Sequence, residues 1–163
     1  MSRTTGGAVR SATTFSVLNV QEAVQLKPAT IERVGRLAET LYSSGFEEEK
    51  VKQVIRALFC THLLSERDAE QQMERAFDVW DDKHTGVLQL SHISHDLSAL
   101  LASDLEPLER QQLIDGLGAD GSGQLEYDGF REVMFAIGSD ASERKGRLAA
   151  LRLYSEDVGL ART

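Results

Sequence analysis

The chain is poor in the residues that build disulfide-rich or membrane-spanning proteins. It has 163 residues, with one cysteine and two prolines. The single cysteine, Cys60, excludes an internal disulfide, and no run of about eighteen apolar residues is present to cross a membrane. Apolar residues make up 41% of the chain, enough for a core in one domain or two small lobes. Long stretches without Pro or Gly favour an all-α protein.

Basic residues are scarce between residues 65 and 142. The net charge is −8 overall, but residues 65–142 hold 17 acidic and 5 basic residues, a net of −12. The two ends, residues 1–21 and 143–163, each carry +2. An acidic domain is a poor nucleic-acid binder. It suits a basic helical protein partner, and the alternative is an acidic surface that is only solvated.

Signatures of catalysis are missing as well. The sequence has no G-x-S-x-G elbow, and Cys60 has no recognisable partner set. The Gly-rich stretch Gly121-Ser122-Gly123 has neither a preceding strand nor a following G-K-[ST], so it is not a phosphate loop. His92 and His95 share a helix face, but no Cys or Glu framework for zinc accompanies them. We therefore expect that the protein is not an enzyme.

Two twelve-residue windows, 37 positions apart, organise the middle of the chain. They are Asp81–His92 and Gly118–Gly129, and each has Gly at its sixth position and Leu at its eighth. Each window follows one helical apolar pattern and precedes another. The pattern predicts helix, loop and helix, twice over, between Met73 and Gly138.

This repeat resembles a pair of EF-hands of the calmodulin, troponin C and myosin light chain superfamily. The resemblance implies an all-α, EF-hand-like fold. Gly86 and Gly123 are expected to bend their loops with positive φ, which a residue without a Cβ adopts easily. Leu88 and Leu125 are expected to pair across the two loops in a short two-stranded bridge.

Most of the calcium ligands that the resemblance implies are missing. Ca²⁺ takes six to eight oxygens, including a bidentate carboxylate at position twelve, where this chain has His92 and Gly129. Position three of the first loop is Lys83, whose ammonium repels a dication. The residual ligand positions are Asp81, Thr85, Asp120, Ser122 and Glu126. We expect no cofactor, and calcium binding at most weakly.

The resemblance also implies a groove that receives an amphipathic helix of a partner. Its lining positions here are Phe77, Trp80, Leu97, Leu101, Phe130, Met134 and Ile137. The expected function is that of a non-catalytic, light-chain-like accessory subunit in a multi-subunit complex. It would bind a basic amphipathic helix constitutively, without calcium. The alternative is a calcium-sensing, calmodulin-like regulator with atypical loops.

Four segments follow from these patterns. They are an extended or anchoring N-terminal segment (1–28), a helical hairpin (29–64), the paired degenerate EF-hands (65–138), and a C-terminal helix and tail (139–163). The hairpin is either a vestigial EF-hand or a plain hairpin, and Ser44 and Glu47 have the spacing of a capping box at the start of its second helix. The last helix either folds back into the groove of the hand pair or reaches a partner.

The first 21 residues bear on location. They are rich in Ser, Thr, Gly and Ala, with two arginines and no acid, which is a composition found in mitochondrial presequences. A convincing amphipathic period is absent, and Gly6-Gly7 would weaken a helix. We expect a cytoplasmic or cytoskeletal location, for example in an axoneme, with a mitochondrial location as the alternative.

Overall fold

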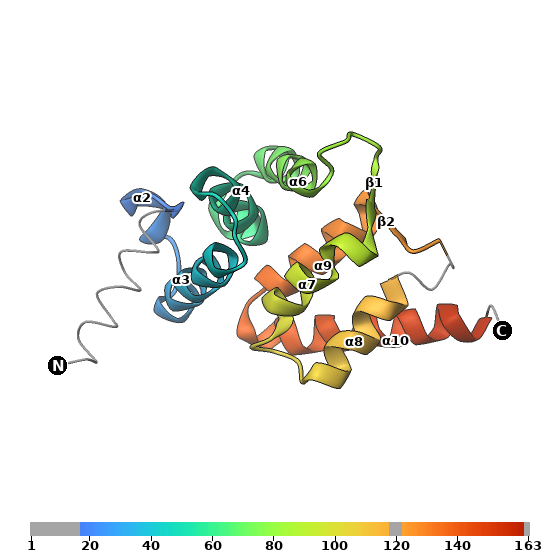
Figure 1. Cartoon of the computed structure of the whole chain (residues 1–163). Helices are drawn as coiled ribbons and strands as arrows, with labels where there is room; N and C mark the ends of the chain where they lie inside the picture. Colours follow the sequence, from blue (N-terminus) through green and yellow to red (C-terminus); the bar gives the residue numbers. More distant parts are fainter. Residues whose placement is uncertain (1–16, 118–121, 162–163) are drawn as a thin grey trace. The chain divides into compact units, whose positions relative to one another are not determined.

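The computed structural model describes residues 17–117 and 122–161, and the side chains of the last helix as far as Arg152. The chain divides into two compact units, Met1–Val79 and Trp80–Thr163. The described elements (Figure 1) are α2 (Val20–Ala23), α3 (Pro28–Ser43), α4 (Glu48–Leu58), α5 (Cys60–Leu63), α6 (Glu66–Trp80), β1 (Val87–Gln89), α7 (Leu90–Leu101), α8 (Pro107–Leu117), β2 (Gln124–Glu126), α9 (Tyr127–Gly138) and α10 (Ala141–Ala161). The predicted all-α, EF-hand-like fold is confirmed. The described elements are helices apart from β1 and β2, which have three residues each.

The first unit contains the hairpin of α3 and α4, which pack against each other. Its apolar residues recur at helical spacing, so each helix turns one continuous face inward. The fully buried members of that face include Val34, Leu41, Val54 and Ile55. Gly45 lies between the two helices with φ +95. Glycine adopts this left-handed conformation without steric strain because it has no Cβ, so α3 can end here.

The described part of the N-terminal segment is anchored on α4. The Asn19 side chain accepts a hydrogen bond from the Glu22 amide at 2.8 Å, and the Glu22 carboxylate accepts one from the Asn19 amide at 3.1 Å, which makes a complete capping box for α2. The same Glu22 carboxylate pairs with the Arg56 guanidinium through two contacts of 2.8 and 2.6 Å. Bidentate pairing of this kind fixes orientation as well as distance, so it holds the short helix in place.

Two local predictions in the hairpin are wrong. Ser44 does not cap α4: it ends α3, where its hydroxyl donates to the Thr40 carbonyl at 3.0 Å, and α4 begins after Glu47 without a side-chain cap. The helix expected to run to about residue 64 is also interrupted at Phe59, whose backbone (φ −111, ψ 17) leaves the helical region and separates α4 from α5.

The second unit is built on the pairing of the two loops. β1 and β2 are antiparallel, with Leu88 opposite Leu125, as expected, and the two leucines are only 2% and 4% exposed. Gly86 and Gly123 have φ +83 and +67, so both predicted bends are confirmed. Around this bridge, α7 packs on α8, and α10 packs on both α8 and α9.

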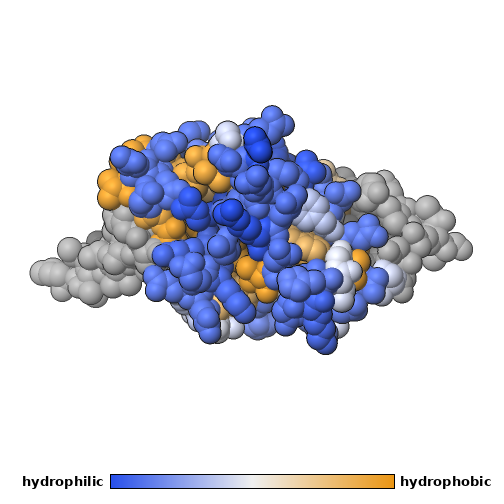
Figure 2. All heavy atoms as spheres, turned by 90° about the horizontal axis from the view of Figure 1, so that it is seen from above, coloured by the Kyte–Doolittle hydropathy of each residue, from blue (hydrophilic) through white to orange (hydrophobic). Residues whose placement is uncertain are grey.

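The surface is mostly hydrophilic on the face shown in Figure 2, where hydrophobic residues form small separate patches. The large apolar side chains that remain exposed include Val20, Val24 and Leu108. In the part of the chain that the structure describes, no helix is both long enough and apolar enough to traverse a bilayer.

Candidate functional site

The first loop is closed around the Asp81 carboxylate. Asp81 is 6% exposed; its Oδ1 accepts from the Thr85 amide at 2.9 Å, and its Oδ2 accepts from the Gly86 amide at 2.9 Å. The Thr85 hydroxyl lies 3.0 Å from Oδ1 and 2.9 Å from the Val87 carbonyl oxygen, and its one proton serves one of them at a time. The loop therefore holds its bend through its own hydrogen bonds.

These bonds also set the charge state of Asp81. Desolvation raises the pKa of the carboxyl, but the hydrogen bonds from Thr85 and Gly86, together with the nearby His84, outweigh that effect and hold the pKa below its ordinary value. His84, the fourth residue of the loop, has φ +54, in the left-handed region where histidine is one of the enriched non-glycine residues. The carboxylate is thus ionised at neutral pH and accepts bonds from three groups of its own loop.

Two of the remaining ligand positions of the first loop lack a side-chain oxygen. Lys83 at position three and His92 at position twelve are both exposed, and neither offers the oxygen that Ca²⁺ requires. Asp81 supplies the one carboxylate at a ligand position, and three of its roughly four lone-pair sites already accept protons. The loop keeps the fold of an EF-hand without its ligand set.

The second loop lies partly outside the described residues, and with it the predicted ligand Asp120. The Ser122 hydroxyl accepts a hydrogen bond from the Gln124 amide at 3.1 Å, and Glu126 is exposed at the end of β2. At position twelve, a Cβ added to Gly129 would lie 2.6 Å from Cδ1 of Leu125. The bridge leucine thus occupies the space through which a side chain at position twelve would leave the backbone.

Metal-ligating side chains are scattered in the described part of the chain. Among residues 17–117 and 122–152, no three or more His, Cys, Asp or Glu side chains lie in a group that could hold a metal ion.

Cys60 is buried, and desolvation raises the pKa of its thiol to about 11. A thiol of that kind is inert, because the thiolate is the reactive form.

The predicted groove residues are mostly core residues in the free chain. Six of the seven belong to the second unit, and Phe77 belongs to the first. Leu97, Leu101, Phe130, Met134 and Ile137 are each no more than 1% exposed. Trp80 is half-buried; its Nε1 donates to Asp96 at 3.0 Å, and its ring meets Phe130 edge-on at 5.6 Å between centroids.

Sequence reasoning missed the contacts that bind α10 to this lobe. The Arg144 guanidinium pairs with Asp104 at 2.8 Å, and Arg152 pairs with Glu109 at 2.8 Å. Between the two arginines, Leu148 is 0% exposed. A signal was present, because residues 144, 148 and 152 recur at a spacing of four and share a helix face. The last helix thus packs on α8 and α9 of the hand pair.

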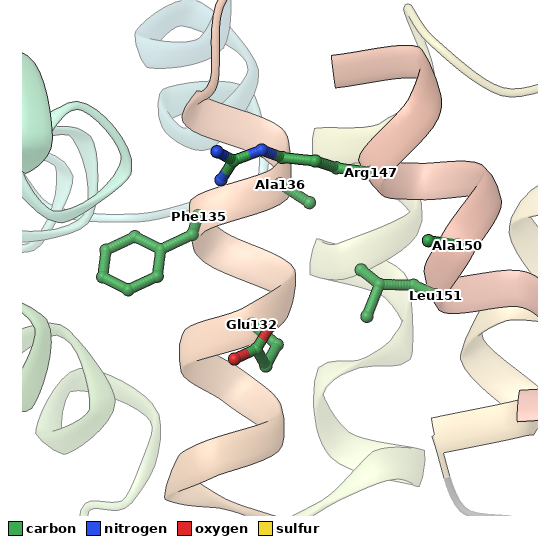
Figure 3. Close-up of a pocket in the computed structure, with 6 residues that line it drawn as sticks. All are labelled: Glu132, Phe135, Ala136, Arg147, Ala150 and Leu151. Carbon is green, nitrogen blue, oxygen red and sulfur yellow. The ribbon is translucent and has the colours of Figure 1, made fainter. Parts of the chain in front are cut away.

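The junction of α9 and α10 contains an open cavity of about 410 Å³. It is lined by Glu132, Phe135, Ala136, Arg147, Ala150 and Leu151. Figure 3 shows Leu151 and Ala150 on the side of α10 that faces α9, whereas Phe135 points away from α10. Helix α10 is therefore incompletely packed against α9 along this edge.

Comparisons with known proteins agree with the fold. The chain is 31% identical to troponin C of Tyrophagus putrescentiae over 94 residues, 30% to troponin C of Tachypleus tridentatus over 93, and 25% to troponin C isoform 2 of Caenorhabditis elegans over 121. These matches cover 56%, 55% and 63% of this chain, and 61%, 60% and 74% of the relatives. The chain thus spans less than two thirds of the length of two of them. No family model and no solved structure matches it.

The two helix–loop–helix units, the bridge of Leu88 and Leu125, and the left-handed glycines at the sixth position of both loops are features of the EF-hand. Similarity to three troponin C proteins points to the same group. The chain therefore has an EF-hand-like fold and is similar in sequence to troponin C proteins.

Proposed function

We propose that the protein is a non-catalytic interaction subunit of a larger assembly, whose EF-hand lobe binds a partner helix without calcium. The likeness to troponin C supports an interaction or regulatory protein rather than an enzyme. The observation that carries the calcium independence is the closure of the first loop around Asp81 by the amides of Thr85 and Gly86. A loop held by its own bonds needs no ion to keep its shape.

The chemistry of the partner follows from the charge of the lobe. Residues 65–142 carry a net charge of −12, so a basic amphipathic helix is the complementary ligand. In sensors of this superfamily, calcium opens the groove, and here the described ligand positions offer no such trigger. The lobe would accordingly hold its partner at all calcium concentrations. Its affinity for the partner helix would fall as the salt concentration rises.

The test is a paired purification of the tagged protein from its native cells, once with calcium and once with a chelator. We expect the same protein partners in both, and their loss at high salt. Titration calorimetry of the pure protein with calcium is the companion measurement. A partner that is retained only with calcium would contradict the proposal.

A calcium-sensing regulator is the second candidate function, because the relatives are troponin C proteins. Saturable calcium binding with a Kd below about 10⁻⁵ M, the weak edge of sensor affinities, would establish that function and refute the first. We further propose a cytoskeletal location, which fluorescence microscopy of the tagged chain would test against the mitochondrial alternative.

A further inference from the structure

One face of α10 has the chemistry expected of a partner helix. Arg144, Leu148 and Arg152 recur at a spacing of four residues, so the face reads basic, apolar, basic. Leu148 is fully buried, and each arginine reaches an acid about forty positions earlier in the sequence. The lobe therefore already binds a helix face that presents Arg, Leu and Arg, and that helix is its own.

The receiving surface is made by α8 and the residue stretch just before it. Asp104 precedes α8 and pairs with Arg144, while Glu109 lies in the first turn of α8 and pairs with Arg152. Glu109 also accepts a hydrogen bond from the Glu106 amide at 3.0 Å. That bond is the main reason that the pKa of Glu109 is lowered, and Arg152 adds to the effect. The Glu109 carboxylate is thus held in place by the lobe itself as well as by Arg152.

The more exposed ion pair of α10 is the one at Arg152, because the side chains of Arg144 and Asp104 are only 16% and 13% exposed. The side chains of Arg152 and Glu109 are 27% and 38% exposed, and ion pairs this accessible to solvent contribute little. On the α9 side, the open cavity beside Ala150 and Leu151 leaves part of the junction unfilled. A partner helix with a larger side chain at this edge could fill it.

We propose that the acidic surface formed by Asp104, Glu109 and α8 is the docking site for a basic amphipathic partner helix, and that α10 occupies it until the partner displaces it. This rests on the proposed function, which supplies the partner, and adds where it binds and what it must displace. A helix that carries Arg, Leu and Arg at a spacing of four is the expected occupant. Only molecules in which α10 is undocked can bind this helix. The affinity of the full chain for it is therefore lowered in proportion to the fraction of undocked molecules.

The test uses the full chain and a fluorescent synthetic peptide of residues 141–161, read by fluorescence anisotropy. The double variant Arg144→Glu/Arg152→Glu alters the chain's own helix and leaves the receiving surface intact. We expect it to bind the peptide at least about tenfold more tightly than the unaltered chain, since its own helix no longer competes. The control is Arg147→Glu on the same helix, because the Arg147 guanidinium pairs with Glu143 of α10 itself. This variant should behave as the unaltered chain.

A second pair of changes tests the receiving surface. Adding Asp104→Arg and Glu109→Arg to the double variant exchanges the charges on both sides, so the chain's own helix should dock again and peptide binding should disappear. Equal binding by all variants, or no binding by a folded double variant, would overturn the inference. If the double variant does not fold, hydrogen exchange of the unaltered chain decides. Amides of residues 141–152 should exchange at least about tenfold faster than those of α8, and equal protection would overturn displacement.

These outcomes separate the inference from the proposed function. Peptide binding as expected, with no helical partner purified from cells, would leave the docking surface standing and refute the proposed function. A calcium-independent partner in cells, with no peptide binding to the double variant, would refute the docking surface alone.

Discussion

Replacing Leu148 with Ala should detach the last helix, because Leu148 is the fully buried side chain of the described part of α10. Leu→Ala changes in protein cores cost about 2 to 5 kcal/mol, with the larger values where a cavity remains. The neighbouring residues Arg147, Ala150 and Leu151 border an open cavity, so the site can relax or admit water. We therefore expect a loss of about 2 to 3 kcal/mol, in the lower part of that range.

The assay is urea unfolding followed by the fluorescence of Trp80, the single tryptophan of the chain. Trp80 belongs to the second unit and packs edge-on against Phe130, so its signal reports the lobe that carries α10. With a urea dependence of about 1.5 kcal/mol per M, the midpoint should fall by roughly 1 to 2 M.

The matched control is Leu151→Ala, the same change on the same helix at a half-buried side chain that borders the cavity. It removes less apolar contact and should cost about 1 kcal/mol or less. Equal shifts for the two variants, or a shift below about 0.5 kcal/mol for Leu148→Ala, the range of ordinary surface changes, would refute the packing described for α10.

Three further predictions concern the loops and the last helix. Gly123→Val should cost about 1 to 2 kcal/mol in urea unfolding, since Gly123 has φ +67 and a residue with a Cβ is strained there; an unchanged midpoint would speak against the loop. Gly146→Ala should raise the melting temperature, with a gain of about 0.5 to 1 kcal/mol, because Gly146 is helical and a Cβ would meet nothing within 4 Å. The pKa of Asp81 lies below its ordinary value of 3.8, so its contribution to stability is complete above that value and is lost as the pH falls through the folded pKa. Unfolding measured between about pH 5 and pH 2 should show this loss, and Asp81→Asn should remove it.

The loops were predictable because their determinants are local. Glycine adopts a positive φ without a steric penalty, and Gly86 and Gly123 both do so at the sixth position. The pairing of Leu88 with Leu125 followed from the common register of the two windows. Both features depend on residues inside twelve-residue segments, so no tertiary information was needed.

The errors arose where several local partners compete for one group. Ser44 has the spacing of a cap for α4, yet its hydroxyl bonds to the preceding turn of α3 instead, and the capping pattern does not distinguish these outcomes. The docking of α10 was undecided for a different reason. Arg144 and Asp104 are forty residues apart in sequence, and helical spacing defines a face but not the surface that it meets.

The loss of calcium ligands and the integrity of the core are linked at Leu125. In the second loop a Cβ at position twelve would lie 2.6 Å from Cδ1 of this leucine, which is 4% exposed and paired with Leu88. A carboxylate side chain at position twelve would therefore require the bridge leucine to move. In the first loop the Asp81 carboxylate already accepts hydrogen bonds from the amides of Thr85 and Gly86. The leucine that a side chain at position twelve would displace is thus the one that pairs the two loops. We infer that restoring ligands by substitution alone would trade stability of the lobe for affinity.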